Sequence, residues 1–120
     1  LRAALCSRQL WQSAGNWVHH ERAHYGVAVA AGAAGEASAQ LDAALQGLAL
    51  LSLHDTAGEQ GVDRAFLELE QAHALQRLAR HGDAASARAR ADALAASFGD
   101  ASLTTWYRER LDRHRQLTPP

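Results

Sequence analysis

The chain has 120 residues, of which 28 are Ala and 17 are Leu, whereas Lys, Ile and Met are absent. This length suits one domain with a substantial core, and the Ala and Leu content favours helices over strands. The 12 Arg and 13 acidic residues leave a net charge of −1, which argues against a nucleic-acid or membrane partner.

Other features of composition narrow the class of protein further. A single Cys, Cys6, excludes an internal disulfide framework. No apolar run approaches the roughly 20 residues of a membrane span, so we expect a cytoplasmic protein. The first residue is Leu rather than Met, which is expected if the chain is a fragment of a larger protein.

Gly and small polar residues divide the chain into six predicted helices. In chain order these are about residues 2–13, 17–32, 36–54, 62–81, 83–98 and 101–116. Turns are expected from Gly32 to Gly35 and at Gly82-Asp83, and only the connection 55–61 is long enough to form a flexible loop.

The helix predicted at 62–81 is apolar on two sides. Phe66, Leu69 and His73 recur at helical spacing on one face, while Leu67 and Leu75 fall on another. Such a helix is expected between neighbouring helices rather than on the surface.

The helix predicted at 101–116 has a single apolar stripe. The stripe contains Trp106, Tyr107, Leu111 and His114, and Arg and acidic residues cover the other faces. This pattern predicts a terminal helix that buries one face and exposes the rest.

A sequence repeat links the two halves of the chain. Segments 21–24 and 70–73 both read Glu-x-Ala-His, at an offset of 49. At an offset of 50, Gly32 aligns with Gly82. At the same offset, segment 42–43 aligns with segment 92–93, and both read Asp-Ala. Ala37, Ala43, Ala87 and Ala93 recur where the paired helices would pack closely. The repeat predicts a helical hairpin used twice.

The stretch 72–94 resembles a tetratricopeptide-type repeat. Leu78 stands four residues before Gly82 and Ala87 five after it, and the first unit has Ala28, Gly32 and Ala37 in these places. The spacing of 49–50 departs from the family's repeat of about 34 residues.

The resemblance implies an all-α array of two tetratricopeptide-like hairpins, of the α-solenoid type, in a single domain 1–120. Residues 1–15 would hold an N-terminal helix, 17–54 and 62–98 the hairpins, and 101–116 a capping helix. Members of this family bind a protein or peptide in a groove lined by the first helix of each hairpin. The corresponding groove candidates are His20, Glu21, His24, Glu70 and His73.

The same segments allow an alternative, a small metalloprotein. In Glu21-x-x-His24 and Glu70-x-x-His73, both side chains share one helix face and can grip one divalent metal. Asp42 and Asp92 would supply further carboxylates, and His20 a further imidazole. The competing interpretation is that the His residues are core residues, each held by a neighbouring carboxylate.

No catalytic motif is recognisable. The sequence lacks a Gly-x-Ser-x-Gly elbow, a phosphate loop and a dinucleotide fingerprint, and Cys6 has no activating neighbour. The sequence therefore favours a non-catalytic interaction module without a cofactor. A homodimer completed by the N-terminal helix is a third hypothesis.

Overall fold

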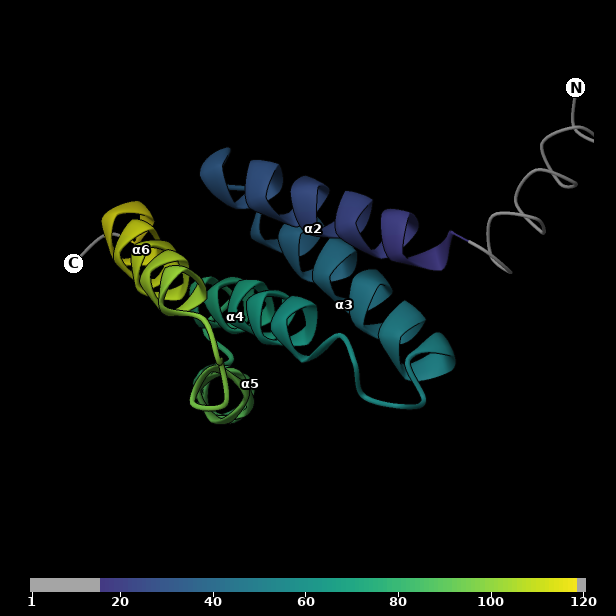
Figure 1. Cartoon of the computed structure of the whole chain (residues 1–120). Coiled ribbons are helices and arrows are strands. Elements are labelled where there is room, and N and C mark those ends of the chain that lie inside the picture. Colours follow the sequence, from purple (N-terminus) through teal and green to yellow (C-terminus); the bar gives the residue numbers. More distant parts are fainter. Residues whose placement is uncertain (1–15, 119–120) are drawn as a thin grey trace, which may run out of the picture.

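The computed structural model describes residues 16–118, and all regular secondary structure in that range is helical (Figure 1). The helices are α2 (Trp17–Ala33), α3 (Ala37–His54), α4 (Gly61–Arg77), α5 (His81–Ala95) and α6 (Ala101–Leu117). The prediction of an all-α chain is confirmed for these residues. The predicted N-terminal helix in 1–15 lies outside them. None of the five helices combines the length and hydropathy needed to cross a bilayer.

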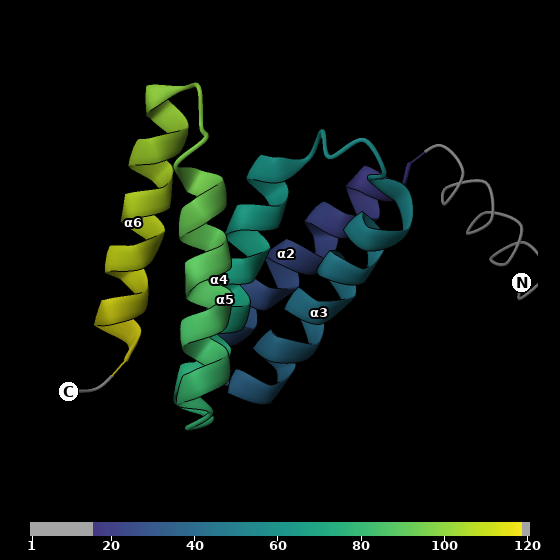
Figure 2. The ribbon, with the colours of Figure 1, turned by 90° about the horizontal axis from the view of Figure 1, so that it is seen from below.

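Helix α4 is central and contacts each of the other four helices. α2 packs on α3, α4 packs on α5, and α3 also packs along α4. Figure 2 shows successive helices running in alternate directions, so that α2, α4 and α6 run the same way. The two apolar sides of α4 account for its position, because Leu67 packs against α3 whereas Leu69 packs towards Tyr107 of α6.

The two short turns of the fold share one backbone geometry. Gly35, between α2 and α3, has φ +79°, and Ala79, between α4 and α5, has φ +62°. In each turn the next amide reaches back to a carbonyl five residues earlier: Glu36 to Ala31 and Arg80 to Leu75, both at 2.9 Å. The turn predicted at Gly82-Asp83 is wrong, because both residues belong to the first turn of α5. Gly32 likewise lies inside α2.

The helices recur at a spacing that the sequence alignment missed. α4 begins 44 residues after α2 (61 against 17), and α5 begins 44 residues after α3 (81 against 37). This register pairs buried Ala28 with Ala72, and Ala43 with Ala87. The offsets of 49 and 50 are therefore wrong as a structural register, since chance identities are frequent in an Ala-rich chain.

Small side chains allow the helices to approach closely. Ala28 of α2 and Ala43 and Ala44 of α3 form one buried cluster. At Gly47, an added Cβ would lie 2.9 Å from Leu67 Cδ2, so only glycine fits there without a shift. Of the four Ala positions predicted at close contacts, Ala43 and Ala87 are buried, whereas Ala37 is half-buried and Ala93 exposed.

Helix α6 presents one face to the rest of the fold. Tyr107 and His114 are buried, and Leu111 packs against the Tyr107 cluster. Trp106 departs from the predicted buried stripe, because 55% of it is exposed.

In the loop before α4, the Asp55 carboxylate accepts hydrogen bonds from the amides of Glu59 and Gln60, both at 2.9 Å.

Candidate functional site

The residues predicted as metal ligands do not come together. Asp42 is exposed and accepts a hydrogen bond from Gln46 at 2.7 Å. Asp92 accepts hydrogen bonds from Arg88 Nε at 2.9 Å and from the Tyr107 hydroxyl at 2.7 Å. Between residues 16 and 118, no group of three or more His, Cys, Asp or Glu side chains could hold a metal ion. Asp42 lies on α3 and Asp92 on α5, and the metal hypothesis is without support in this part of the chain.

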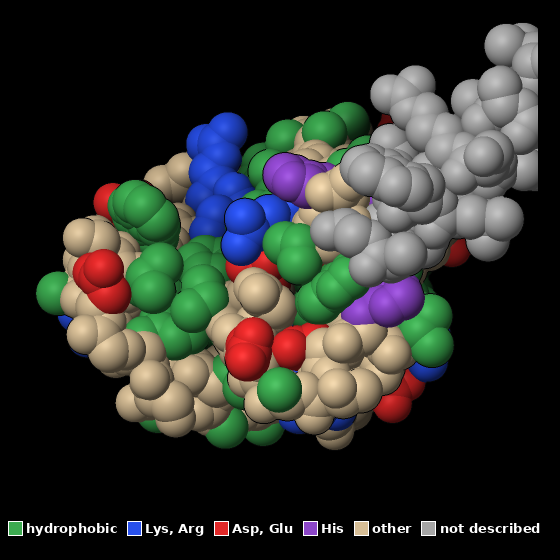
Figure 3. Space-filling view, turned by 45° about the vertical axis from the view of Figure 1, so that its right-hand side comes forward, with side chains coloured by type: hydrophobic (Ala, Val, Ile, Leu, Met, Phe, Trp, Pro, Cys, Tyr) green, Lys and Arg blue, Asp and Glu red, His purple; other side chains and the backbone are tan. Residues whose placement is uncertain are grey.

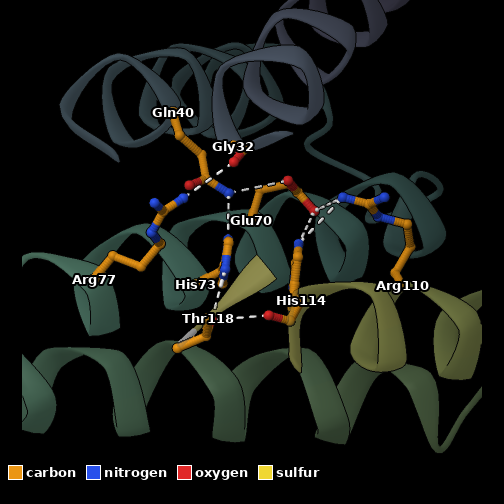
Figure 4. Close-up of polar contacts among 8 residues, drawn as sticks. All are labelled: Gly32, Gln40, Glu70, His73, Arg77, Arg110, His114 and Thr118. Atoms are coloured by element: carbon orange, nitrogen blue, oxygen red, sulfur yellow. Dashed lines mark hydrogen bonds and ion pairs between the residues drawn. The ribbon is translucent and has the colours of Figure 1, made fainter. Parts of the chain in front are cut away.

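His73 instead lies in a chain of hydrogen bonds that joins α3, α4 and the end of α6 (Figure 4). Gln40 Nε2 donates to His73 Nδ1 at 2.9 Å. His73 Nε2 lies 3.0 Å from Thr118 Oγ1, which itself donates to the His114 carbonyl at 2.8 Å. Because the Gln40 amide nitrogen is a donor, Nδ1 must accept, and the ring carries its proton on Nε2. Both ring nitrogens are therefore engaged.

Glu70 is the centre of the charged part of this network and is fully buried. Its Oε2 accepts from His114 Nε2 at 2.8 Å and from Arg110 Nη2 at 3.1 Å, and its Oε1 accepts from Gln40 at 3.2 Å. Burial alone would raise the pKa of Glu70, but the hydrogen bonds and charges of His114 and Arg110 outweigh it and lower the pKa. Glu70 is therefore an ionised, fully partnered carboxylate.

The two histidines of the network stack face to face. The rings of His73 and His114 lie 4.1 Å apart and 1° from parallel. Burial lowers the pKa of His73 to about 4, and the positive charges of His114, Arg77 and Arg110 add to this effect against the opposing charge of Glu70. A neutral His73 without a free ring nitrogen has a structural role rather than a catalytic one.

Gly32 allows Gln40 to reach the network. An added Cβ on Gly32 would lie 2.7 Å from Gln40 Nε2, so a larger residue would displace the amide. The Gly32 carbonyl accepts a hydrogen bond from Arg77 Nη1 at 3.1 Å. The end of α2 is thus tied to the end of α4.

A cavity of about 350 Å³ lies beside this network, between α4, α5 and α6. His73, His81 and His114 all line it. His81 is hydrogen-bonded to Gln76 at 3.1 Å, and the other two histidines belong to the network just described. The cavity thus offers no set of free imidazoles to a ligand.

An open groove of about 970 Å³ lies between α2, α4 and α6, with the loop before α4 at one end. Apolar and aromatic side chains form much of its surface, and charged side chains are placed among them. The lining residues are Glu21, Arg22, Tyr25, Glu59, Gln60, Val62, Asp63, Phe66, Leu103, Trp106, Glu109, Arg110 and Arg113. Tyr25 and Phe66 meet edge to face, with ring centroids 6.1 Å apart.

Two carboxyl groups lie next to each other in this groove. Glu21 is only 1% exposed, and the Asp63 side chain is 15% exposed. Burial raises the pKa of Glu21 to about 8, with further contributions from its hydrogen bond to Asp63 and from the charges of Asp63 and Asp55; Arg22 opposes the shift. Glu21 is therefore mostly protonated at neutral pH.

Of the five predicted groove residues, Glu21 alone lines this groove. His20 and His24 are half-buried on α2 outside the lining, and Glu70 and His73 belong to the buried network. Four important residues were not predicted as site residues: Gln40, Asp63, Arg110 and Trp106. The sequence placed Trp106 in the buried stripe of α6, and the partners of the other three residues are distant along the chain.

Comparisons with known proteins do not assign the chain to a family. The chain matches no protein-family model, no curated protein and no solved structure.

Proposed function

We propose that the chain is a non-catalytic interaction module that binds a peptide segment of a partner protein in the groove between α2, α4 and α6. One observation carries the proposal: the groove combines an open volume of about 970 Å³ with aromatic walls, and Trp106 leaves 55% of its surface exposed there. Exposed aromatic side chains in a concave site are typical of binding surfaces.

The arrangement of the helices supports this proposal. α2 and α4 are the first helices of two successive helix pairs, and α6 follows them in the same direction (Figure 2). In tetratricopeptide-like proteins, to which we propose this chain is similar in architecture, the equivalent helices line the peptide groove. The 44-residue spacing is longer than the family's repeat of about 34 residues.

The charge distribution supports a peptide rather than a nucleic acid as the ligand. Three Arg and four acidic residues line the groove, so their formal charges nearly cancel. Figure 3 shows that the basic side chains on the face drawn there are grouped locally among apolar and acidic ones. A nucleic-acid surface needs a continuous basic track.

The proposal is tested with a displayed library of random 12-residue peptides, selected against the full chain. Trp106→Ala removes the exposed aromatic wall, and enriched peptides are expected to bind this variant at least about tenfold more weakly. The matched control is Leu53→Ala, which removes another exposed apolar side chain, 69% exposed and outside the groove. Failure to enrich peptides, or equal affinity for both variants, contradicts the proposal.

A further inference from the structure

We propose that the groove selects a peptide with an Arg or Lys side chain close to a large apolar one. The basic side chain binds at the Glu21–Asp63 carboxyl pair, and the apolar one packs against the wall formed by Tyr25, Phe66 and Trp106. This inference rests on the proposed function and specifies its ligand.

The acidic part and the aromatic part of the groove are neighbouring layers. On α4, Phe66 follows Asp63 by three residues, and on α2, Tyr25 follows Glu21 by four. Each interval is about one helical turn, or roughly 5 Å along the axis. α2 and α4 run in the same direction, so the layers have the same order on both walls (Figure 2). An extended peptide advances about 3.3 Å per residue, which places its basic and apolar side chains one or two residues apart.

The carboxyl pair lacks a buried cationic partner. The Glu21 carboxyl is hydrogen-bonded to Asp63, but its Oε2 is buried and accepts no hydrogen bond from a described residue. Arg22 contacts Asp63 Oδ2 at 2.9 Å, but its side chain is 60% exposed. Buried carboxyl groups normally have a charged or hydrogen-bonding partner. Because Glu21 lines the open groove, a ligand bound there can supply the missing partner.

The remaining charges of the groove favour a cation at this position. Asp55 adds a negative charge near Glu21, and Glu59 also lines this part of the groove. On the α6 wall, Arg110 Nη2 is bound to Glu70 and Arg113 to Gln116, whereas Arg110 Nε is buried without a hydrogen-bond partner among the described residues. An acidic side chain bound at Arg110 would share the groove with four acidic residues, which favour a basic ligand instead; these are Glu21, Glu59, Asp63 and Glu109.

Proton release gives this mode of binding a specific signature. The pKa of Glu21 is about 8 in the free chain, so its carboxyl is mostly protonated at pH 7. A bound guanidinium or ammonium favours the carboxylate, and we expect binding at pH 7 to release a proton. Calorimetry in phosphate and in Tris measures this release, because the two buffers differ in heat of ionisation.

The test uses the peptides enriched by the library selection against the full chain. We expect an Arg or Lys one or two residues from Trp, Phe or Leu. Affinity should fall at least about tenfold for Asp63→Asn and Glu21→Gln. Glu21→Gln should also abolish proton release, and because Gln resembles the protonated carboxyl, this variant should keep its fold. Glu36→Gln, at an exposed position outside the groove, should bind as the wild type does.

The possible outcomes separate this inference from the proposed function. If enriched peptides need Trp106 but carry no basic residue, or if Glu21→Gln and Asp63→Asn bind them normally, the basic-ligand inference is overturned while the groove proposal stands. If no peptide depends on Trp106, both are overturned. Concentration-dependent self-association that is lost in Asp63→Asn, without peptide enrichment, would identify a second copy of the chain as the occupant and overturn the proposal of a partner peptide.

Discussion

Acidification should destabilise the fold through His73, and His73→Gln should remove this effect. In the folded chain, Gln40 donates to Nδ1 of the neutral ring, so a proton on Nδ1 would face another donor. Glu70 favours the protonated ring, but burial and the positive charges of His114, Arg77 and Arg110 outweigh it. Protonation must therefore weaken the contact between α3 and α4, whereas a Gln side chain has no such titration.

The size of the effect follows from the two pKa values. His73 titrates at about 4 in the folded chain and near 6.5 in the unfolded chain. Stability is fully present above pH 6.5, falls as the unfolded state gains its proton, and levels off below the folded pKa. Between pH 7.5 and 5, this linkage removes about 2 kcal/mol from the free energy of unfolding. Such a loss is a large fraction of the stability of a small protein.

Urea unfolding followed by far-ultraviolet circular dichroism at pH 7.5 and 5 measures this loss. The stability advantage of the wild type over His73→Gln should shrink by about 2 kcal/mol at the lower pH. Other titrating groups act on both proteins and largely cancel in the difference. As a control, His81→Gln replaces an exposed histidine outside the network and should leave the acid effect unchanged. An equal difference between wild type and His73→Gln at both pH values would show that protonation of His73 does not destabilise the fold.

Three further substitutions test the packing, each by thermal and urea unfolding. Gly32→Ala should lower the free energy of unfolding by about 1–3 kcal/mol, because the added Cβ would meet Gln40. Gly82→Ala is the control, and because there is open space around this glycine, the substitution should be neutral or slightly stabilising. Equal effects of the two substitutions would contradict the close approach of Gly32 and Gln40. Ala79→Gly should stabilise the fold by about 0.5–1 kcal/mol because φ is +62° at this exposed position, and a loss of stability would show that the turn has another geometry. Leu67→Ala should cost about 2–5 kcal/mol because this side chain is fully buried, and a loss below 1 kcal/mol would contradict its place in the core.

The local part of the fold could be predicted from the sequence. The two apolar sides of 62–81 predicted the central position of α4, and the stripe on 101–116 predicted its one-sided burial. The turn before α5 could not be located, because glycine was taken as its marker. Ala79 adopts the left-handed conformation instead, and Gly82 lies inside the helix. The tertiary environment here overrides a conformational preference worth about 1 kcal/mol.

The candidate site was harder to predict because its contacts are distant along the chain. Gln40 meets His73 across 33 residues, and Arg110 meets Glu70 across 40. No local pattern marks such pairs. The Glu-x-Ala-His segments suggested equivalent sites, but Glu21 lies near the start of α2 and Glu70 in the middle of α4. Glu21 lies beside Asp63 in the wall of the open groove, a neighbour that no local pattern in the sequence indicates.

Arg110 connects the buried network to the groove. Its Nη2 binds the buried Glu70 carboxylate, and the same side chain lines the groove wall of α6. A buried ion pair seldom adds net stability over apolar side chains of the same volume, because desolvation offsets the attraction. Its geometric demands are strict, however, since each donor must meet its acceptor. We infer that Glu70, through Arg110 and His114, fixes how α6 sits against α4. The width of the groove depends on that position, so the buried network sets the shape of the proposed binding surface.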